Sequence, residues 1–111
     1  MANQLPYDAT MMPSELERNI SEVDRRIRAA ERAAGRAPGA VSLLAASKTK
    51  PSELVRQAHG FGLSAFGENY AQEMAEKAAA LADLPLSWHF IGPIQSNKTA
   101  LIAEVSDWVH S

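Results

Sequence analysis

The stretch VSLLAASKTKP, residues 41–51, decides the fold that this sequence predicts. Residues 41–46 form a continuous apolar run with turn residues on both sides, which is typical of a parallel strand covered on both faces. The sequence then becomes polar, and Pro51 suits the first turn of a helix. Because side chains alternate along a strand, Lys48 shares a face with Ala46 and lies at the carboxyl end, where parallel strands carry function.

The sequence beyond this stretch repeats the order of strand, polar turn and helix. We expect further strands at residues 63–66 and 86–91, helices at residues 51–59, 70–84 and 97–105, and the start of a last strand near the end. Repeated βα units force a parallel sheet with right-handed crossovers. The fold class is therefore α/β, and two architectures fit: an open doubly wound sheet or a (β/α)8 barrel. A closed barrel needs ~250 residues, so this chain would form only part of one.

An amphipathic helix is predicted ahead of these repeats, at residues 13–34, with Gly35 as its C-cap. One apolar stripe runs along it, formed by Leu16, Ile20, Val23, Ile27 and Ala30. Its other face carries charges of both signs, which indicates a solvated surface. An arginine-rich helix that binds nucleic acid is disfavoured, because the acidic residues between the basic ones would repel phosphate. Residues 1–12 have no apolar period and are interpreted as a mobile leader. Residues 13–111 are expected to form one unit, which looks truncated.

Composition excludes several classes of protein. The chain has 111 residues, a net charge of −2 and no cysteine, so disulfides, thiolate metal sites and cysteine nucleophiles are absent. This charge gives no overall attraction to nucleic acid or to anionic membranes. The sequence contains no signal peptide and no apolar run of the ~18 residues that a membrane span needs. We expect a cytoplasmic protein without nucleic-acid, membrane or metal partners.

Two further polar residues follow or lie in predicted strands. Asn69 comes at the end of the second strand and His89 lies in the third, and both point toward a barrel mouth if their parity matches that of Lys48. A histidine in an apolar strand is more often a satisfied core residue, and its neighbours Trp88 and Phe90 are expected to pack against helices. Ser96, in the turn after the third strand, is in the right kind of place for a site residue, but it is at least as well explained as the N-cap of the following helix.

Four segments, LLAASKTKP, FGENY, WHFIGPIQSNK and DWVHS, closely resemble in order and spacing the pyridoxal phosphate homeostasis proteins. The resemblance runs from Val41 to the last residue. It implies a barrel of the alanine-racemase type that holds pyridoxal 5′-phosphate as a Schiff base on a lysine, which by position is Lys48. It also implies that this chain is the amino-terminal half of a barrel about twice as long, whose phosphate-binding motif lies in the other half.

The chemistry of Lys48 agrees with this resemblance. A Schiff base forms from a neutral amine, so a site of this kind must favour the neutral form by burial or by a nearby cation such as Lys50. The favoured function is a non-catalytic protein that binds the cofactor through Lys48, Asn69 and His89 and hands it on to apo-enzymes. An amino-acid racemase and a fragment with little activity are the alternatives. Open sheet edges predict self-association.

Overall fold

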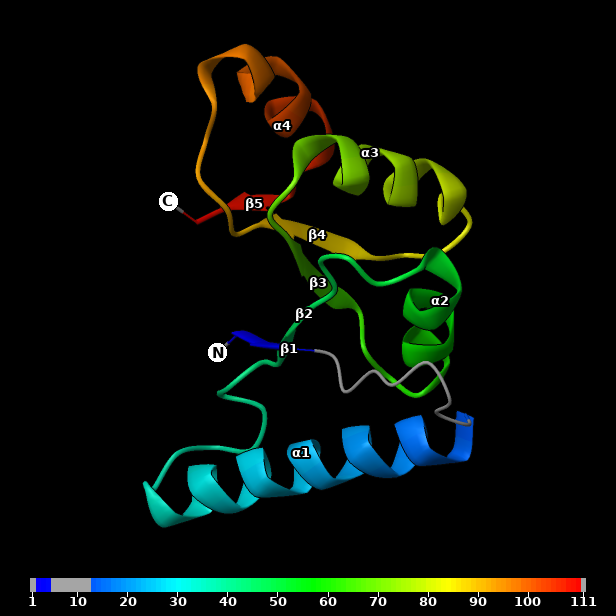
Figure 1. The fold of residues 1–111 in the computed structure, drawn as a ribbon. Helices are drawn as coiled ribbons and strands as arrows, with labels where there is room; N and C mark the ends of the chain where they lie inside the picture. Colours follow the sequence, from blue (N-terminus) through cyan, green and yellow to red (C-terminus); the bar gives the residue numbers. More distant parts are fainter. Residues whose placement is uncertain (1, 5–12, 111) are drawn as a thin grey trace.

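The computed structural model describes residues 2–4 and 13–110, with side chains from residue 15 onward (Figure 1). Within this part of the chain, one parallel sheet has its strands in sequential order: β1 (Ala2–Gln4), β2 (Leu44–Ala46), β3 (Ala65–Glu68), β4 (Ser87–Phe90) and β5 (Trp108–Val109). The connections contain α1 (Pro13–Ala33), α2 (Ser52–Gly60), α3 (Ala71–Ala80), the 3₁₀ turn η1 (Ser96–Lys98) and α4 (Thr99–Val105).

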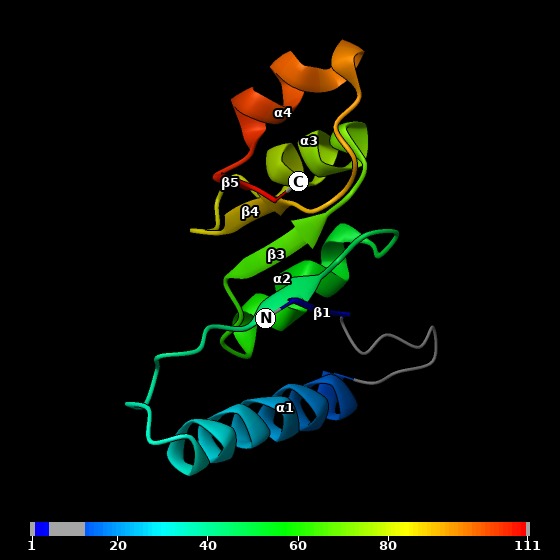
Figure 2. The same ribbon diagram turned by 90° about the vertical axis from the view of Figure 1, so that its left-hand side faces the viewer.

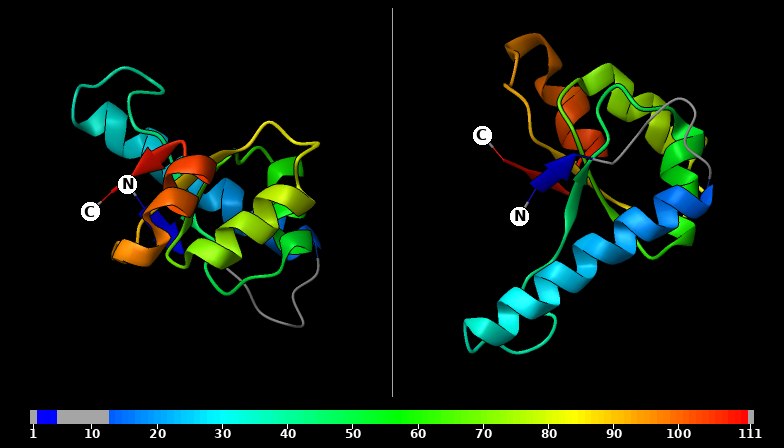
Figure 3. Two further views of the ribbon diagram at one scale, coloured as in Figure 1. Left: turned by 90° about the horizontal axis from the view of Figure 1, so that it is seen from above. Right: turned by 60° about the horizontal axis from the view of Figure 1, so that its bottom comes forward.

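The sheet has one covered and one open face. Helices α2 and α3 lie behind the sheet in Figure 2, α1 and α4 flank it, and both ends of the chain emerge on the open side (Figures 1 and 3). A doubly wound sheet reverses its strand order and is covered on both faces, whereas a βα barrel adds each strand beside the preceding one. The sequential order β1-β2-β3-β4-β5 therefore has the topology of a barrel wall.

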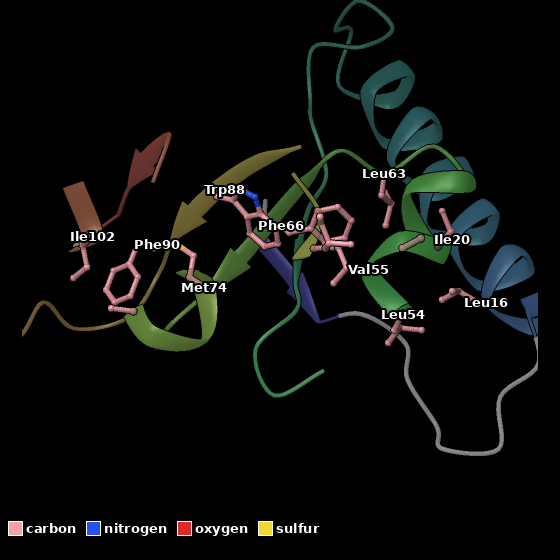
Figure 4. Close-up of a cluster of buried hydrophobic side chains, with 14 residues drawn as sticks. Leu16, Ile20, Leu54, Val55, Leu63, Phe66, Met74, Trp88, Phe90 and Ile102 are labelled. Atoms are coloured by element: carbon pink, nitrogen blue, oxygen red, sulfur yellow. The ribbon is translucent and has the colours of Figure 1, made fainter. Parts of the chain in front are cut away.

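The hydrophobic core fills the space between the sheet and the helices (Figure 4). Phe66 of β3 and Trp88 of β4 pack with ring centroids 6.1 Å apart, and Phe90 is also buried. This confirms that Trp88 and Phe90 pack against helices. Helix α1 adds Leu16 and Ile20 to the same cluster, so the first part of its apolar stripe packs beside α2, whereas Ala30 at the other end of the stripe is exposed.

Strand β2 is shorter than the predicted strand at residues 41–46. The Val41 N–H donates to the Glu31 carboxylate at 2.7 Å, and the Val41 carbonyl accepts from the Arg28 guanidinium at 3.2 Å. Both backbone groups of Val41 are thus bonded to side chains of α1 and cannot pair in the sheet. The apolar run consequently enters the sheet only at Leu44.

Helices α1 and α2 are each followed by a glycine with a left-handed backbone conformation. Gly35 has φ +72°, and the Arg36 N–H donates to the Glu31 carbonyl at 2.8 Å, which confirms the predicted C-cap of α1. Helix α2 ends at Gly60, one residue later than the predicted end at residue 59, and Phe61 is its C-cap. Gly62, with φ +105°, follows the cap.

The same cap explains why β3 begins two residues later than predicted. The Leu63 N–H donates to the Ala58 carbonyl at 3.1 Å and thereby closes the end of α2. The strand therefore runs from Ala65 to Glu68, and Glu68 lies inside it rather than in the following turn. Helix α3 is likewise shorter than residues 70–84, because a turn bonded from the Leu84 N–H to the Leu81 carbonyl precedes Pro85.

The structure changes the interpretation of the amino terminus. Ala2–Gln4, assigned above to a mobile leader, forms β1 and pairs in parallel with Leu44–Ala46. Pairing through the backbone needs no side-chain period, so the sequence gives no signal for it. Helix α1 is then the crossover between two paired strands, and the other residues of the expected leader lie outside the described part. None of the helices in the described ranges is long and apolar enough to span a membrane.

Candidate functional site

Lys48 lies in a tight turn that directly follows β2. The sheet ladder continues one residue past the strand, because the Ser47 N–H donates to the Gly67 carbonyl at 2.9 Å. The chain then turns, and the Lys50 N–H closes the turn on the Ser47 carbonyl at 3.0 Å. Lys48 is half-buried in this turn. Its position at the carboxyl end of an inner strand is the one that the sequence predicts.

Thr49 gives this turn an uncommon backbone. Its φ of +64° is in the left-handed region, which a β-branched residue rarely adopts. The Thr49 hydroxyl donates to the Lys48 carbonyl at 2.6 Å, and the Thr49 N–H donates to Glu73 Oε2 at 2.7 Å. A conformation of this kind persists only where surrounding contacts hold it. The contact from Glu73 shows that α3 helps to hold the turn.

A buried charged network lies behind the turn, on the helix side of the sheet. Lys77 of α3 is 4% exposed and donates to the Ser47 carbonyl at 2.7 Å. It also donates to Glu68 Oε2 and to Glu73 Oε2, both at 2.9 Å. The Ser47 hydroxyl donates to the same Glu68 oxygen. The network therefore joins the end of β2, the end of β3 and helix α3.

Glu68 is the most deeply placed carboxylate of this network. Its side chain is fully buried, and its Oε1 has no hydrogen-bond partner in the described part of the chain. Burial raises the pKa of Glu68 above its ordinary value, although the contacts from Ser47 and Lys77 act in the opposite direction. The site thus contains a carboxylate whose charge the protein stabilises only partly.

Strand register brings Lys48 and Asn69 to neighbouring strand ends. Ala46 of β2 lies opposite Gly67 of β3, and each candidate comes two residues later. Both residues thus lie at the carboxyl edge, and by alternation they follow the open face of the sheet. The structure therefore places together two of the three residues that the sequence selects.

Asn69 is tightly enclosed by the turn after β4. A Cβ atom on Gly92 would lie 2.5 Å from Asn69 Cβ and 2.6 Å from its carbonyl oxygen, so only glycine fits at this approach. The Asn69 Oδ1 atom is buried and has no partner among the described residues. A hollow of about 280 Å³ beside it is lined in part by Tyr70, Gln95 and Lys98. The FGENY and GPIQSNK segments therefore meet here.

His89 lies on the same face but deeper along the strands. It pairs in register with Gly67, two residues before Asn69, which corresponds to ~7 Å toward the amino ends. By alternation this parity matches that of Lys48, which is the condition under which the sequence points His89 toward the barrel mouth. Register alone therefore places His89 in the row below Lys48 and Asn69.

His89 contacts Ser87 of its own strand, Trp108 of β5 and His110, which follows β5. Its Nδ1 lies 3.0 Å from His110 Nε2, its Nε2 lies 3.1 Å from the Ser87 hydroxyl, and its ring stacks on Trp108 at 6.2 Å. Burial, followed by the charge of His110, lowers the pKa of His89. His89, Trp108 and His110 line an open hollow of about 890 Å³. The neutral form of His89 is thus favoured.

The remaining candidates have structural positions. Ser96 is the first residue of η1, and the N-cap position belongs to Gln95, so the predicted N-cap is wrong. No group of three His, Cys, Asp or Glu side chains within the described ranges is arranged to hold a metal ion. The absence of a metal from the function remains a prediction.

Sequence reasoning missed the roles of Glu73 and Lys77. Their spacing of four residues on a helix is the usual spacing of an exposed ion pair, so it gave no signal of burial. The available signal was Glu68, because a carboxylate inside an apolar strand has to find a cation. Only the later start of β3 reveals that Glu68 is such a residue.

These features define a class of protein. The chain forms a wall of parallel βα units, with a lysine in a fixed turn at the carboxyl end of a strand. No family model matches the chain. Comparison with known proteins nevertheless finds close relatives among curated sequences and solved structures.

One relative is the pyridoxal phosphate homeostasis protein of Pseudomonas aeruginosa, which is 63% identical over 98 residues, 88% of this chain and 43% of the relative. The solved structure of PipY from Synechococcus elongatus with pyridoxal phosphate bound matches with a TM-score of 0.65 and 42% identity, over 80% of this chain and 41% of that one. A protein of unknown function from Bifidobacterium adolescentis matches with a TM-score of 0.84 and 32% identity, over 96% and 49%.

The chain is thus a homologue of one part of the pyridoxal phosphate homeostasis proteins, over 88% of its own length. It spans less than half the length of the relatives that it matches, and its fold is the amino-terminal part of their TIM-type barrel. The resemblance read from the four sequence segments is therefore confirmed, and so is the barrel alternative over the doubly wound sheet.

Proposed function

We propose that this chain binds pyridoxal 5′-phosphate covalently through Lys48 and serves the intracellular homeostasis of the cofactor without catalysing a reaction. The observation that supports this most is the Lys48 turn itself, which sits at the carboxyl end of β2 in a family with a relative solved with this ligand bound. The cofactor would supply an aldehyde. The neutral Nζ of Lys48 would add to the aldehyde carbon, and loss of one water would leave a carbon–nitrogen double bond.

The residues around Lys48 fit such a ligand. Asn69 is on the adjacent strand end, and its unpaired buried Oδ1 would accept a hydrogen bond from a donor on the ligand. His89 lies below them on the same face, where its neutral ring contributes a further polar contact. In this proposal Lys48 holds the ligand, Asn69 orients it and His89 limits its depth.

The test is to incubate the chain with pyridoxal phosphate, reduce with borohydride and locate the added mass by peptide mass spectrometry. We expect the product on Lys48, together with a visible absorbance band that the Lys48→Ala variant lacks. A Lys50→Ala variant is the matched control, and it should keep the product on Lys48. An unchanged band and product in Lys48→Ala would show that another amine is the attachment site.

The racemase alternative is tested separately. Racemisation needs a base on each face of the substrate carbon, and the proposed role requires none. We expect no deuterium exchange at the α-carbon of free amino acids incubated with the chain and cofactor in D₂O. Exchange that depends on Lys48 would replace the homeostasis role with an enzymatic one.

The wider role is part of the same proposal. We expect the protein to act in the cytoplasm, to hand the cofactor to apo-enzymes, and to require neither nucleic acid nor a membrane. Transfer is measured as activation of an apo-enzyme by the loaded chain in the presence of a phosphatase that destroys free cofactor. Activation no faster than with the same amount of free cofactor would contradict direct transfer.

A further inference from the structure

All three N–H donors of the Lys77 ammonium group are engaged in hydrogen bonds around the Lys48 turn. A lysine ammonium has three N–H donors, and Lys77 has three acceptors within 2.9 Å: the Ser47 carbonyl, Glu68 Oε2 and Glu73 Oε2. Because the side chain is 95% buried, water does not compete for these bonds. The position of the ammonium group is therefore fixed relative to the end of β2.

The two peptide groups that flank Lys48 are both held from α3. The carbonyl of Ser47 belongs to the peptide group before Lys48 and accepts from Lys77. The N–H of Thr49 belongs to the peptide group after Lys48 and donates to Glu73 at 2.7 Å. The planes of these two groups determine φ and ψ of Lys48. One ion pair on one helix thus fixes the backbone from which the Lys48 side chain projects.

Stability alone does not account for this arrangement. Buried ion pairs are often no more stabilising than apolar residues of the same size. The network in addition holds Thr49 at φ +64°, and such strain is typical of functional sites. The cost of burying charge and the backbone strain coincide at the turn that carries Lys48. This coincidence points to a role in placing the Lys48 amine.

We propose that Glu73 and Lys77 are positioning residues, which fix the turn at residues 47–50 so that the Lys48 amine is presented to pyridoxal phosphate. This inference rests on the proposed function, because it assumes that Lys48 is the attachment site. Neither residue is expected to touch the ligand, since both lie on the helix side of the sheet.

The decisive variant is Glu73→Ala. Glu73 is 25% exposed, so its removal leaves the Lys77–Glu68 pair in place and should leave the fold intact. Glu76→Ala is the matched control, because Glu76 has the same charge, lies on the same helix and is exposed. Glu73→Gln tests rescue, because its amide oxygen can still accept from the Thr49 N–H.

Three quantities are measured for each variant: hydrogen exchange of the Thr49 amide by NMR, the rate of product formation on Lys48 trapped by borohydride, and the melting temperature. In Glu73→Ala we expect Thr49 exchange to accelerate at least ~10-fold and product formation to slow ~10-fold, with a melting temperature close to that of Glu76→Ala. Glu73→Gln should restore most of both.

Two outcomes separate the inference from the proposed function. If Thr49 exchange and the Lys48 rate in Glu73→Ala equal those of Glu76→Ala, or if the rate falls only in step with the melting temperature, the positioning role is overturned. If Thr49 exchange accelerates as expected but no chain, wild type included, forms a product on Lys48, the proposed function is overturned while fixation of the turn by Glu73 is supported.

Discussion

Thr49 is the residue whose own conformation opposes its chemical type. At φ +64° a β-branched side chain is strained, whereas asparagine tolerates this region. The Thr49→Asn variant should therefore raise the free energy of unfolding by about 0.5–1 kcal/mol, because the N–H contact to Glu73 stays while the strain is relieved. Urea denaturation measures the change.

The matched control for this substitution is Thr99→Asn. Thr99 is also exposed but has an ordinary helical φ of −57°, so its replacement should change the free energy of unfolding by less than about 0.5 kcal/mol. Equal effects at both positions would mean that asparagine acts through a general property and that Thr49 carries no strain.

The predictability of the site differs from residue to residue. Lys48 and Asn69 could be selected from sequence because residues at strand ends follow a parity that needs no knowledge of packing. Glu68 could not be assigned to a strand, because the start of β3 depends on the Leu63 N–H. That N–H donates to a carbonyl at the end of α2. Lys77 could not be recognised as buried, because burial of a charge depends on partners that are distant in sequence.

At the scale of the elements, Gly92 lets the turn after β4 lie against the end of β3. A methyl group there would contact backbone atoms of Asn69 at 2.6–2.7 Å, and backbone cannot move aside. We expect Gly92→Ala to lower the free energy of unfolding by about 1–3 kcal/mol. Gly60→Ala is the control of opposite sign, since Gly60 is helical with open space around it and should gain about 0.5–1 kcal/mol. A neutral Gly92→Ala would contradict the close approach.

The link between α1 and β2 predicts a pH dependence. Hydrogen bonding from the Val41 N–H is the main cause that lowers the pKa of Glu31 below its usual 4.5, with further contributions from Gly39 and Arg28. A carboxylate with a lowered folded-state pKa stabilises the protein above its unfolded pKa, and this contribution is lost as the pH falls through the folded one. Glu31→Gln should therefore destabilise the chain at pH 7 and much less below pH ~4.

The measurement is the urea midpoint at a series of pH values for Glu31→Gln and for Glu22→Gln. Glu22 pairs with arginines on the exposed face of α1, where an ion pair contributes little, so its replacement should have a small effect at every pH. A Glu31→Gln penalty that is constant from pH 7 to pH 3 would assign the effect to shape rather than to charge.

The elements themselves were largely predictable. Each βα unit carries its own apolar period and turn residues, so all three strands expected within residues 41–91 are present. Their boundaries were not, because Val41, whose type favours a strand, has both backbone groups taken by Glu31 and Arg28. Strand β1 could not be anticipated, since it is defined by backbone pairing at an edge.

At the scale of the whole molecule, one face of the sheet and the β5 edge are open. Trp108 and Val109 of β5 are 61% and 45% exposed, and an unprotected edge pairs readily with another chain. We expect the mass measured by sedimentation to rise with protein concentration, and Val109→Lys to suppress this association. Ile94→Lys is the control, because Ile94 is equally exposed but outside the sheet. A measured mass that stays at the monomer value at every concentration would contradict association through the β5 edge.

The same edge gives the protein an optical signal of its own. The sequence contains two tryptophans, of which Trp88 is buried in the core and Trp108 is exposed beside His89. The fluorescence spectrum should therefore contain a blue component from Trp88 and a red component from Trp108. Any strand that covers β5, whether from a second copy or from the rest of a barrel, would shift the red component toward the blue. Emission at a single excitation wavelength thus reports closure of the sheet without any label.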